Sequence, residues 1–193
     1  HMLKKNKNAF PFNYLDNLIP EPLFLINNDG KIDCFSNVCT HRGNILINKE
    51  CNVKKNIICG YHGKQFDTLG KFKFMPMTQG MKNFPSSKDN LPKVKLSKWK
   101  QFIFSSLDPR IKFKELISEL ENRVGWMPIE EFKFQKKLSK NYYVDANWAL
   151  YCDNYLEGFH IPFIHEELNS VLDFNNYDVE IFKYSNHQIG IAK

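Results

Sequence analysis

Two short turns, each with one cysteine and one histidine, constrain the fold of this chain more than any other feature of its sequence. The first occupies residues 39–43 (CTHRG) and the second residues 59–63 (CGYHG). Thiolate and imidazole groups are metal ligands, and the seventeen residues after the first histidine allow an antiparallel excursion that returns the second turn to the first. The sequence therefore predicts that four side chains converge on one metal centre: Cys39, His41, Cys59 and His62.

Two kinds of metal centre fit this set of ligands. A structural zinc site accepts two cysteines and two histidines in a tetrahedron, but zinc fingers usually place cysteine next to cysteine and histidine next to histidine along the chain. The alternation seen here suits a [2Fe-2S] cluster in which one iron takes both cysteines and the other takes both histidines. The remaining three cysteines fall outside the pattern and are expected to be buried apolar thiols: Cys34, Cys51 and Cys152.

The two turns resemble the Rieske [2Fe-2S] signature, and this resemblance assigns Cys39 and Cys59 to one iron and His41 and His62 to the other. Cytochrome bc-type Rieske proteins carry an extra cysteine in each cluster loop and hydroxyl donors after the second loop, which this chain lacks. Fewer hydrogen bonds to the cluster sulfurs imply a reduction potential toward the bottom of the Rieske range. The family often has Trp where this chain has Lys64.

A second group of candidate residues lies in a stretch without positive charge. The chain has a net charge of +6, yet residues 141–182 contain eight acidic residues and no Lys or Arg. A helix is expected from about residue 147 to 159, with Asp153, Glu157 and His160 on one polar stripe. An ordinary solvated helix face is the alternative, although such a face in this chain would be expected to carry lysines.

A proline follows this predicted helix and changes the direction of the chain. Positions five residues apart cannot share one side of a helix, so His160 and His165 require a bend if they are to meet. Pro162 lies between them and is expected to supply that bend.

In this order, the two motifs resemble the Rieske non-haem iron oxygenases, the aromatic-ring-hydroxylating dioxygenase α-subunit family. The second motif is similar to the choline monooxygenase-like branch. The resemblance implies that His160 and His165 are ligands of a mononuclear Fe(II). It also implies that Glu157, or Asp153 as the fallback, relays electrons from the Rieske histidine of a neighbouring subunit. The family's third ligand, a downstream aspartate, has no candidate here, so we expect an inactive, C-terminally truncated piece of an α-subunit.

The resemblance also implies the cofactors and partners of the complete protein. It predicts an oxidoreductase that receives electrons from NAD(P)H through a reductase or ferredoxin, within a homotrimer, and uses O₂ to hydroxylate or demethylate a small organic substrate. A Rieske-type ferredoxin that only carries electrons is the alternative. The choline monooxygenase-like phrase suggests a quaternary ammonium substrate in a cation–π cage, but an aromatic ring fits equally well.

Composition narrows the classes of partner and the cellular compartment that the chain can have. Only three of the 27 basic residues are Arg, and they are not clustered, which disfavours a phosphate-reading surface and a nucleic-acid partner. No apolar run approaches the roughly 20 residues of a membrane helix, and no export signal follows the lysine-rich start. An odd number of unevenly spaced cysteines suits a reducing compartment. We therefore expect a cytoplasmic protein without a membrane span.

The sequence pattern predicts an α+β fold in two parts. Residues 3–110 are expected to form a small antiparallel β Rieske domain behind a two-residue cloning remnant, and residues 111–193 the start of a helix-grip-like α+β catalytic domain. Turn residues predict hairpins around Asp29-Gly30 and Thr68-Leu69-Gly70, and residues 75–95 are expected to be a loop. Apolar periodicity predicts a helix over residues 112–124, strands over 99–107 and 132–138, and a hairpin over 178–192.

Overall fold

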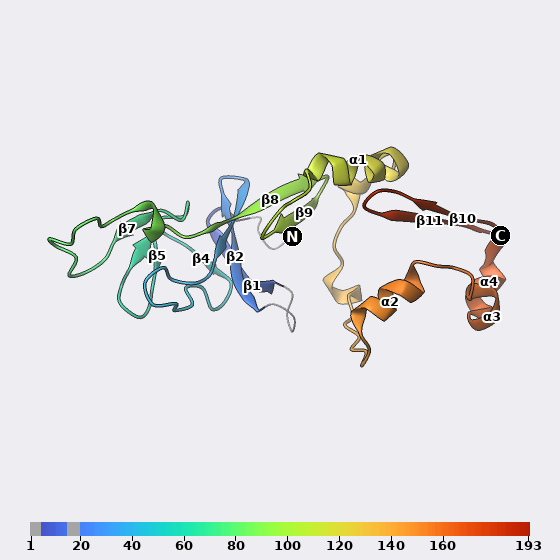
Figure 1. Cartoon of the computed structure of the whole chain (residues 1–193), viewed down its shortest axis with the longest axis horizontal. Coiled ribbons are helices and arrows are strands. Elements are labelled where there is room, and N and C mark those ends of the chain that lie inside the picture. The colour runs from blue at the N-terminus through green and yellow to red at the C-terminus, as the bar shows by residue number, and fades with distance from the viewer. Residues whose placement is uncertain (1–4, 15–19) are drawn as a thin grey trace. The chain divides into compact units, whose positions relative to one another are not determined.

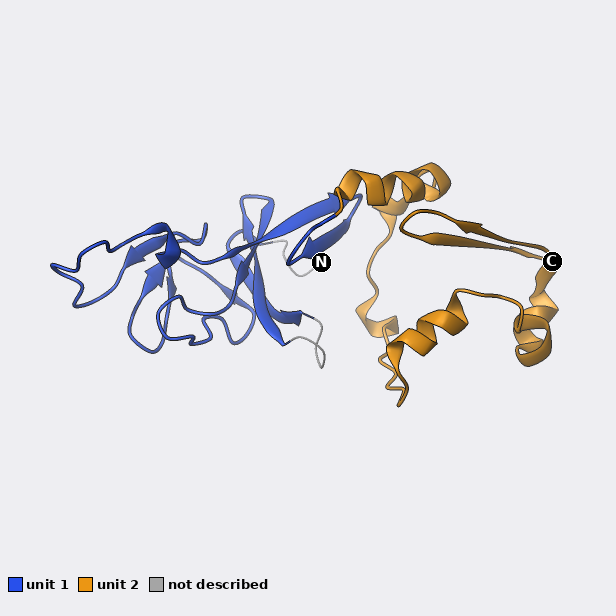
Figure 2. Ribbon diagram, in the orientation of Figure 1, with its two compact units in different colours: residues 1–110 blue, residues 111–193 orange. Residues whose placement is uncertain are grey.

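The computed structural model describes residues 5–14 and 20–193. The chain divides into two compact units, residues 1–110 and residues 111–193 (Figure 2). Within the described residues, no helix is long and apolar enough to cross a membrane.

The first unit is built from antiparallel strands in two sheets (Figure 1). The larger sheet has the order β4-β1-β2-β3-β8-β9, and the smaller one has the order β5-β6-β7. The strands of the larger sheet are β1 (Asn8–Tyr14), β2 (Glu21–Asn28), β3 (Lys31–Ser36), β4 (Cys51–Asn52), β8 (Lys93–Trp99) and β9 (Phe102–Ser106). The smaller sheet contains β5 (Ile57–Ile58), β6 (Gln65–Phe66) and β7 (Phe72–Phe74), and a 3₁₀ turn, η1, spans Ser87–Asp89.

The hairpin between β2 and β3 confirms the turn predicted from its two central residues. Asp29 and Gly30 both have positive φ, 52° and 88°, as a two-residue hairpin turn of type I′ requires. The register pairs Asn28 with Lys31 across the turn. The hairpin between β6 and β7 is also confirmed.

Strand β2 is apolar on both faces because each face packs into a different core. Phe24 and Ile26 are fully buried in one core, which also contains the thiols Cys39 and Cys59. Leu23 belongs to a second core on the alternate positions of the strand. The two cysteines of the predicted metal centre are therefore anchored in the main core of the unit.

The second unit contains short helices and one hairpin. Its elements are α1 (Phe113–Val124), η2 (Ile129–Glu131), η3 (Lys136–Leu138), α2 (Trp148–Tyr155), α3 (Ile161–Ile164), α4 (Glu166–Val171), β10 (Leu172–Ile181) and β11 (Asn186–Ala192). β10 and β11 form an antiparallel pair with an irregular register between Asp173 and Asp178. The charged side chain of Arg123 on α1 contacts Glu180 on β10, which links the helix to the hairpin.

Several predicted elements are confirmed and others are wrong. The helix over residues 112–124 and the final hairpin are confirmed, although β10 begins six residues earlier than expected. The strand predicted over 132–138 is wrong: this stretch is irregular and ends in η3, without the neighbouring strand that a ladder requires. The single strand predicted over 99–107 is the end of β8 and all of β9, joined by a turn in which Lys100 has a φ of 51°. β1, α3 and α4 were not predicted.

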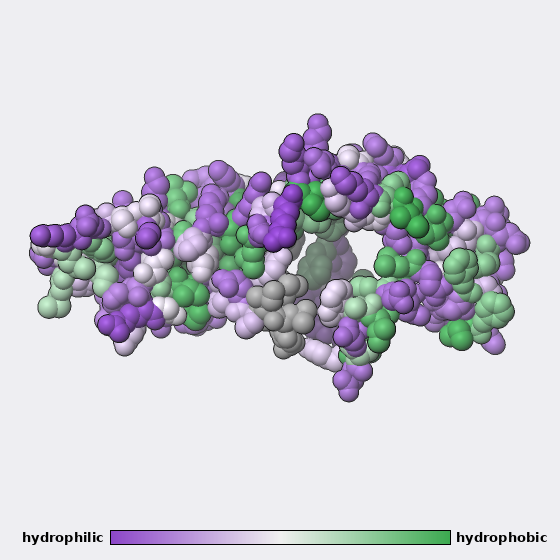
Figure 3. Space-filling view, in the orientation of Figure 1, coloured by the Kyte–Doolittle hydropathy of each residue, from purple (hydrophilic) through white to green (hydrophobic). Residues whose placement is uncertain are grey.

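Apolar side chains are mostly exposed in the second unit. Among the described residues of this unit, the buried apolar side chains are Ile129 and Ile161, whereas Trp126 and Tyr143 are 81% and 94% exposed. Apolar surface is visible around α3 and α4 in Figure 3. Exposed apolar area on this scale is typical of an interaction surface.

Candidate metal centres

The two cysteine–histidine turns have the same backbone hydrogen bonds. The N–H of Cys39 donates to the carbonyl of Asn44 at 2.8 Å, and the N–H of Cys59 donates to the carbonyl of Lys64 at 2.8 Å. In each loop the bond therefore runs from the cysteine to the fifth residue after it. Both loops therefore close in the same way, although the histidine is the second residue after the cysteine in the first loop and the third in the second.

A glycine at the fourth position after each cysteine allows the backbone conformation that closes the loop. Gly43 and Gly63 have φ values of 72° and 70°, a left-handed conformation that is costly for residues with a Cβ atom. Their N–H groups donate to the carbonyls of Cys39 and Cys59 at 3.1 and 3.0 Å. The closing glycines of the two motifs, Gly43 and Gly63, are thus required by the backbone of the turns.

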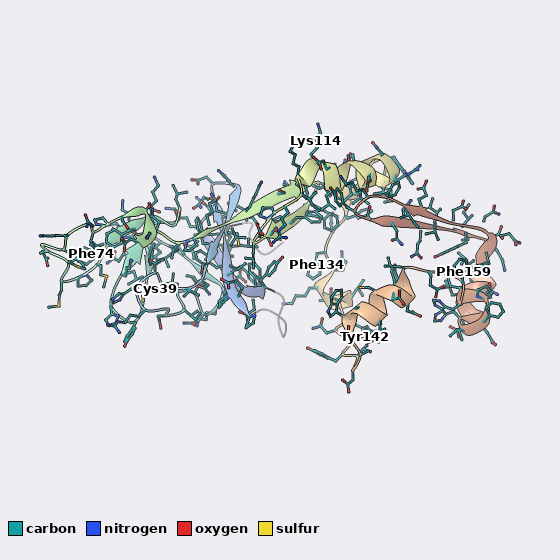
Figure 4. All side chains as sticks on the ribbon, viewed as in Figure 1. Cys39, Phe74, Lys114, Phe134, Tyr142 and Phe159 are labelled. Carbon is teal, nitrogen blue, oxygen red and sulfur yellow. The ribbon has the colours of Figure 1, made fainter. Side chains whose placement is uncertain are left out.

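The loops bring ligands of like type together. The rings of His41 and His62 meet edge to face with their centroids 4.7 Å apart, and the thiols of Cys39 and Cys59 lie within hydrogen-bonding reach of each other. Both cysteines are buried, and both histidines are exposed. Figure 4 shows Cys39 among the loops of the first unit. This pairing, cysteine with cysteine and histidine with histidine, is the division that a Rieske cluster makes between its two irons.

The two thiols differ in their hydrogen-bond environment. Burial raises the pKa of the Cys39 thiol, and the neighbouring Cys59 adds to this effect. Burial also acts against ionisation of Cys59, but hydrogen bonds from the backbone N–H groups of Tyr61 and His62 outweigh it and lower the pKa of that thiol. Burial lowers the pKa of His41, and the charges of His62, Arg42 and Lys64 lower it further. A neutral imidazole and a deprotonated thiol are the forms that bind metal.

Two residues that the sequence analysis missed also contact these loops. The side-chain amide of Asn44 donates to the Sγ of Cys59 at 3.7 Å, and so crosses from the first loop to the second. The carbonyl of Asp89 accepts a hydrogen bond from the Thr40 hydroxyl at 2.9 Å. Asn44 directly follows the glycine of the first turn, which was a local signal, whereas nothing near Asp89 in the sequence pointed to the site.

The remaining cysteines only partly match the expectation of buried thiols. All five cysteines lie in the described part of the chain and are free. Cys34 is fully buried, and burial raises its pKa to about 12. Cys51 is half-buried, but Cys152 is exposed on α2. The prediction for Cys152 is wrong because α2 has no buried face in this unit.

The polar stripe predicted on the second helix is also wrong. α2 begins after Asn147, whose side chain caps the N–H of Ala149 at 2.9 Å, and it ends at Tyr155. Glu157 and His160 therefore follow the helix instead of continuing it, and only Asp153 remains on α2, with an exposed side chain.

Glu157 and His160 meet through the turn that follows α2. One carboxylate oxygen of Glu157 contacts the Nδ1 of His160, and the other accepts the N–H of Phe159 at 2.6 Å. The hydrogen bond from His160 is the largest of the effects that lower the pKa of Glu157 below its ordinary value of 4.5. A carboxylate on the second nitrogen of an imidazole is the arrangement that orients a metal-binding histidine.

The two histidines of the second motif lie close together without the bend predicted at Pro162, because Pro162 lies inside a helical turn and the backbone leaves the helical conformation only at His165 (φ −109°, ψ 68°). Helix α3 is a single turn with Pro162 near its start, and His165 follows it. The rings of His160 and His165 lie with their centroids 5.1 Å apart, in an edge-to-face contact.

Within residues 5–14 and 20–193, no group of three or more His, Cys, Asp and Glu side chains is arranged to hold a metal ion.

Comparisons with known families match both parts of the chain. Residues 9–85 match the Rieske [2Fe-2S] domain, and residues 126–191 match the catalytic domain of the ring-hydroxylating α-subunit. The chain thus contains a Rieske domain and a ring-hydroxylating α-subunit domain. It is a homologue of the Rieske oxygenases. The predicted family is confirmed, and the α+β fold class with it.

Individual relatives agree with this family. The chloroplastic choline monooxygenase of Arabidopsis thaliana is 30% identical over 80% of this chain, and the oxygenase subunit of carnitine monooxygenase from Escherichia coli K12 is 27% identical over 91%. A solved quaternary ammonium Rieske monooxygenase has a TM-score of 0.78 at 21% identity, over all of this chain and 52% of that structure. This chain spans only 39% and 48% of the lengths of the two relatives.

Proposed function

We propose that Cys39, His41, Cys59 and His62 hold a Rieske [2Fe-2S] cluster that accepts and passes on single electrons. The observation that carries this proposal is the pairing of like ligands by two loops with the same backbone hydrogen bonds. Each iron of such a cluster needs only two protein ligands, and the loops supply one cysteine pair and one histidine pair. When bound, the cluster supplies reversible one-electron chemistry.

The residues around the cluster loops have separate tasks in this proposal. The buried cysteines would hold one iron and the exposed His41 and His62 would hold the other, so the histidine side of the site would be accessible to an electron donor. Asn44 donates to the Sγ of Cys59 and stabilises the additional negative charge of the reduced state. Cys39 needs to lose its proton before it binds iron, and its burial favours the metal-bound form over a free thiolate.

His160 and His165 are proposed as two protein ligands of a mononuclear ferrous iron. Their rings are close together, and the described residues supply two of the three ligands of a 2-His-1-carboxylate triad. Glu157 receives the N–H of His160 and so directs the other ring nitrogen toward a metal. This contact favours Glu157 over Asp153 as the carboxylate that links the iron site to the electron donor.

For the whole protein we propose a Rieske oxygenase that hydroxylates or demethylates a small organic substrate with O₂. Electrons come from NAD(P)H through a reductase or ferredoxin, and the subunits form a homotrimer in the cytoplasm. The match of residues 126–191 to an oxygenase catalytic domain supports this function over a ferredoxin that only carries electrons.

A quaternary ammonium compound is the proposed substrate class. Support comes from the choline and carnitine monooxygenases among the relatives, and from the aromatic side chains of the second unit, whose rings can hold a quaternary ammonium group. Oxygen uptake by the complete gene product with choline, carnitine and toluate tests this proposal. Uptake with toluate alone would contradict it.

Reconstitution of the chain with iron and sulfide tests the cluster itself. We expect two irons and two acid-labile sulfides per chain and the EPR signal of a reduced Rieske cluster, and we expect His41→Ala to abolish that signal because one iron loses half of its protein ligands. The matched control is His187→Ala, since His187 contacts Glu180 in the second unit. Stoichiometric zinc without sulfide, or an unchanged signal in His41→Ala, would contradict the proposal.

A further inference from the structure

Lys64, directly after the second cluster turn, is buried in an unusual way for a lysine. Its side chain is 2% exposed, and its Nζ lies 2.9 Å from the Oδ1 of Asp89, which is 17% exposed. The rings of Phe66, Phe72 and Phe84 surround the ammonium with centroids 5.7, 5.4 and 5.9 Å away. A buried lysine is costly unless a counter-ion and aromatic faces compensate its charge, and here both are present.

The pair connects the two cluster loops to each other. The carbonyl of Lys64 accepts the N–H of Cys59 and so closes the second loop. Asp89, bonded to the Lys64 ammonium, accepts the hydroxyl of Thr40 from the first loop on its own carbonyl. A single residue, Asp89, therefore holds one loop through its side chain and the other through its backbone.

Asp89 is itself held in place by the turn that contains it. Its Oδ2 accepts the N–H of Ser86 at 2.8 Å and the hydroxyl of Ser86 at 3.1 Å, in a capping box at the start of η1. Because the carboxylate is fixed by these bonds, it does not simply follow the lysine. The pair is therefore a rigid connection, and breaking it frees one loop relative to the other.

We propose that Lys64 and Asp89 form a buried ion-pair clamp that fixes the separation of the two cluster loops and places two opposite, compensating charges beside the [2Fe-2S] cluster. The clamp rests on the proposed cluster function. Lys64 and Asp89 are positioning residues, because they act through the loops and through their charges and do not bind the irons.

The two charges act on the cluster in opposite directions. Each charge of the pair is joined to a cluster loop, because Lys64 directly follows the second loop and the carbonyl of Asp89 accepts the Thr40 hydroxyl of the first. Reduction adds one negative charge to the cluster, so Lys64 favours the reduced state and Asp89 disfavours it. Loss of either partner alone should shift the reduction potential, with opposite signs, and loss of both should return it toward the wild-type value.

The test compares Lys64→Met, Asp89→Asn and the double variant in the reconstituted chain. Methionine matches the lysine side chain up to Cε, lacks its ammonium group and packs against aromatic rings, and asparagine retains an acceptor for Ser86. We expect Lys64→Met to lower the cluster reduction potential and Asp89→Asn to raise it. Each single variant should lose its cluster roughly tenfold faster in a chelator, since one buried charge is left unpaired, and the double variant should lose it more slowly than either.

The matched control is Lys93→Met. Lys93 also pairs with a buried aspartate, Asp33, and lies over the ring of Phe35, but its side chain is 55% exposed and it links β3 to β8. The Lys93→Met substitution should leave the reduction potential of the cluster unchanged. If Lys64→Met does not fold, the reduction potential of Asp89→Asn alone tests the clamp, and a potential that is not raised would contradict it.

The outcomes separate this proposal from the proposed function. A wild-type chain that takes up no cluster overturns both. A wild-type chain with a Rieske cluster, together with single variants whose potentials are unchanged or shift in the same direction, overturns only the clamp. A merely structural role would speed cluster loss without the opposite shifts in potential.

Discussion

Gly70 is packed against the core of the first unit at a position where no other residue fits. It has a φ of 75°, and a Cβ atom placed on it would lie 2.6 Å from the Cε1 of Phe35. Phe35 is one of the fully buried side chains of this core, so it has no free space into which to move. The turn between β6 and β7 therefore depends on glycine for two separate reasons, its backbone conformation and its contact.

We expect Gly70→Ala to lower the free energy of unfolding by about 2–4 kcal/mol, as the sum of backbone strain and overpacking. Chemical denaturation followed by circular dichroism measures this change. Gly80→Ala is the matched control, because Gly80 has a φ of 79° but no atom within 4 Å of the added Cβ, and it should cost only about 1 kcal/mol. Equal losses in the two variants would show that the contact with Phe35 does not matter.

At the scale of elements, the β10–β11 hairpin positions the segment that carries the second pair of histidines. Gln188 on β11 donates to the carbonyl of Tyr155 at the end of α2, at 2.7 Å. The Tyr177 ring on β10 covers Gly158, where an added Cβ would lie 2.4 Å from the ring. The turn from α2 to α3, and therefore the direction of His160, depends on this close approach.

We expect Gly158→Ala to displace this turn and to separate the rings of His160 and His165. The NOE between their ring protons measures the effect and should weaken or disappear. Adding Tyr177→Ala should restore the NOE, because it removes the ring that the new Cβ meets. A single variant that retains the wild-type NOE would show that the hairpin does not position the histidines.

At the scale of the whole molecule, the two units differ in how much apolar surface they bury. In the first unit, Phe24, Ile26 and Phe66 are completely inaccessible. In the second, the described buried apolar side chains are Ile129 and Ile161. Burial of apolar area is the dominant stabilising contribution in folding. The second unit therefore gains little stability from its own core while its aromatic side chains stay exposed.

We expect hydrogen exchange of the whole chain to separate the two units. Amides of β2 and β3 should exchange only through global unfolding of the first unit, whereas those of β10 and β11 should exchange through local opening, at least about a hundredfold faster. Mass spectrometry of peptides from each strand measures both rates in one sample. Equal protection of β2 and β10 would show that the second unit has a core of its own.

Some features of this protein follow from short segments of sequence. The Asp29-Gly30 turn, the glycines at positions 43 and 63 and the helix over residues 112–124 are local, because φ preferences and apolar periodicity act within a few residues. The strand predicted over residues 132–138 is wrong, because a strand needs a partner. The helix predicted over 147–159 begins where expected but ends four residues early, at Tyr155, because a helix end depends on what packs beyond it.

The sequence by itself determined the ligand types and their spacing, and with them the family, because a cluster loop is a local structure closed by its own backbone. Only the tertiary structure decided that Lys64 is buried against Asp89, that Asp89 also holds Thr40, and that Glu157 instead of Asp153 meets His160. These contacts join segments far apart in the chain or depend on where a helix ends. Their energies come from burial and charge compensation, which no short segment contains.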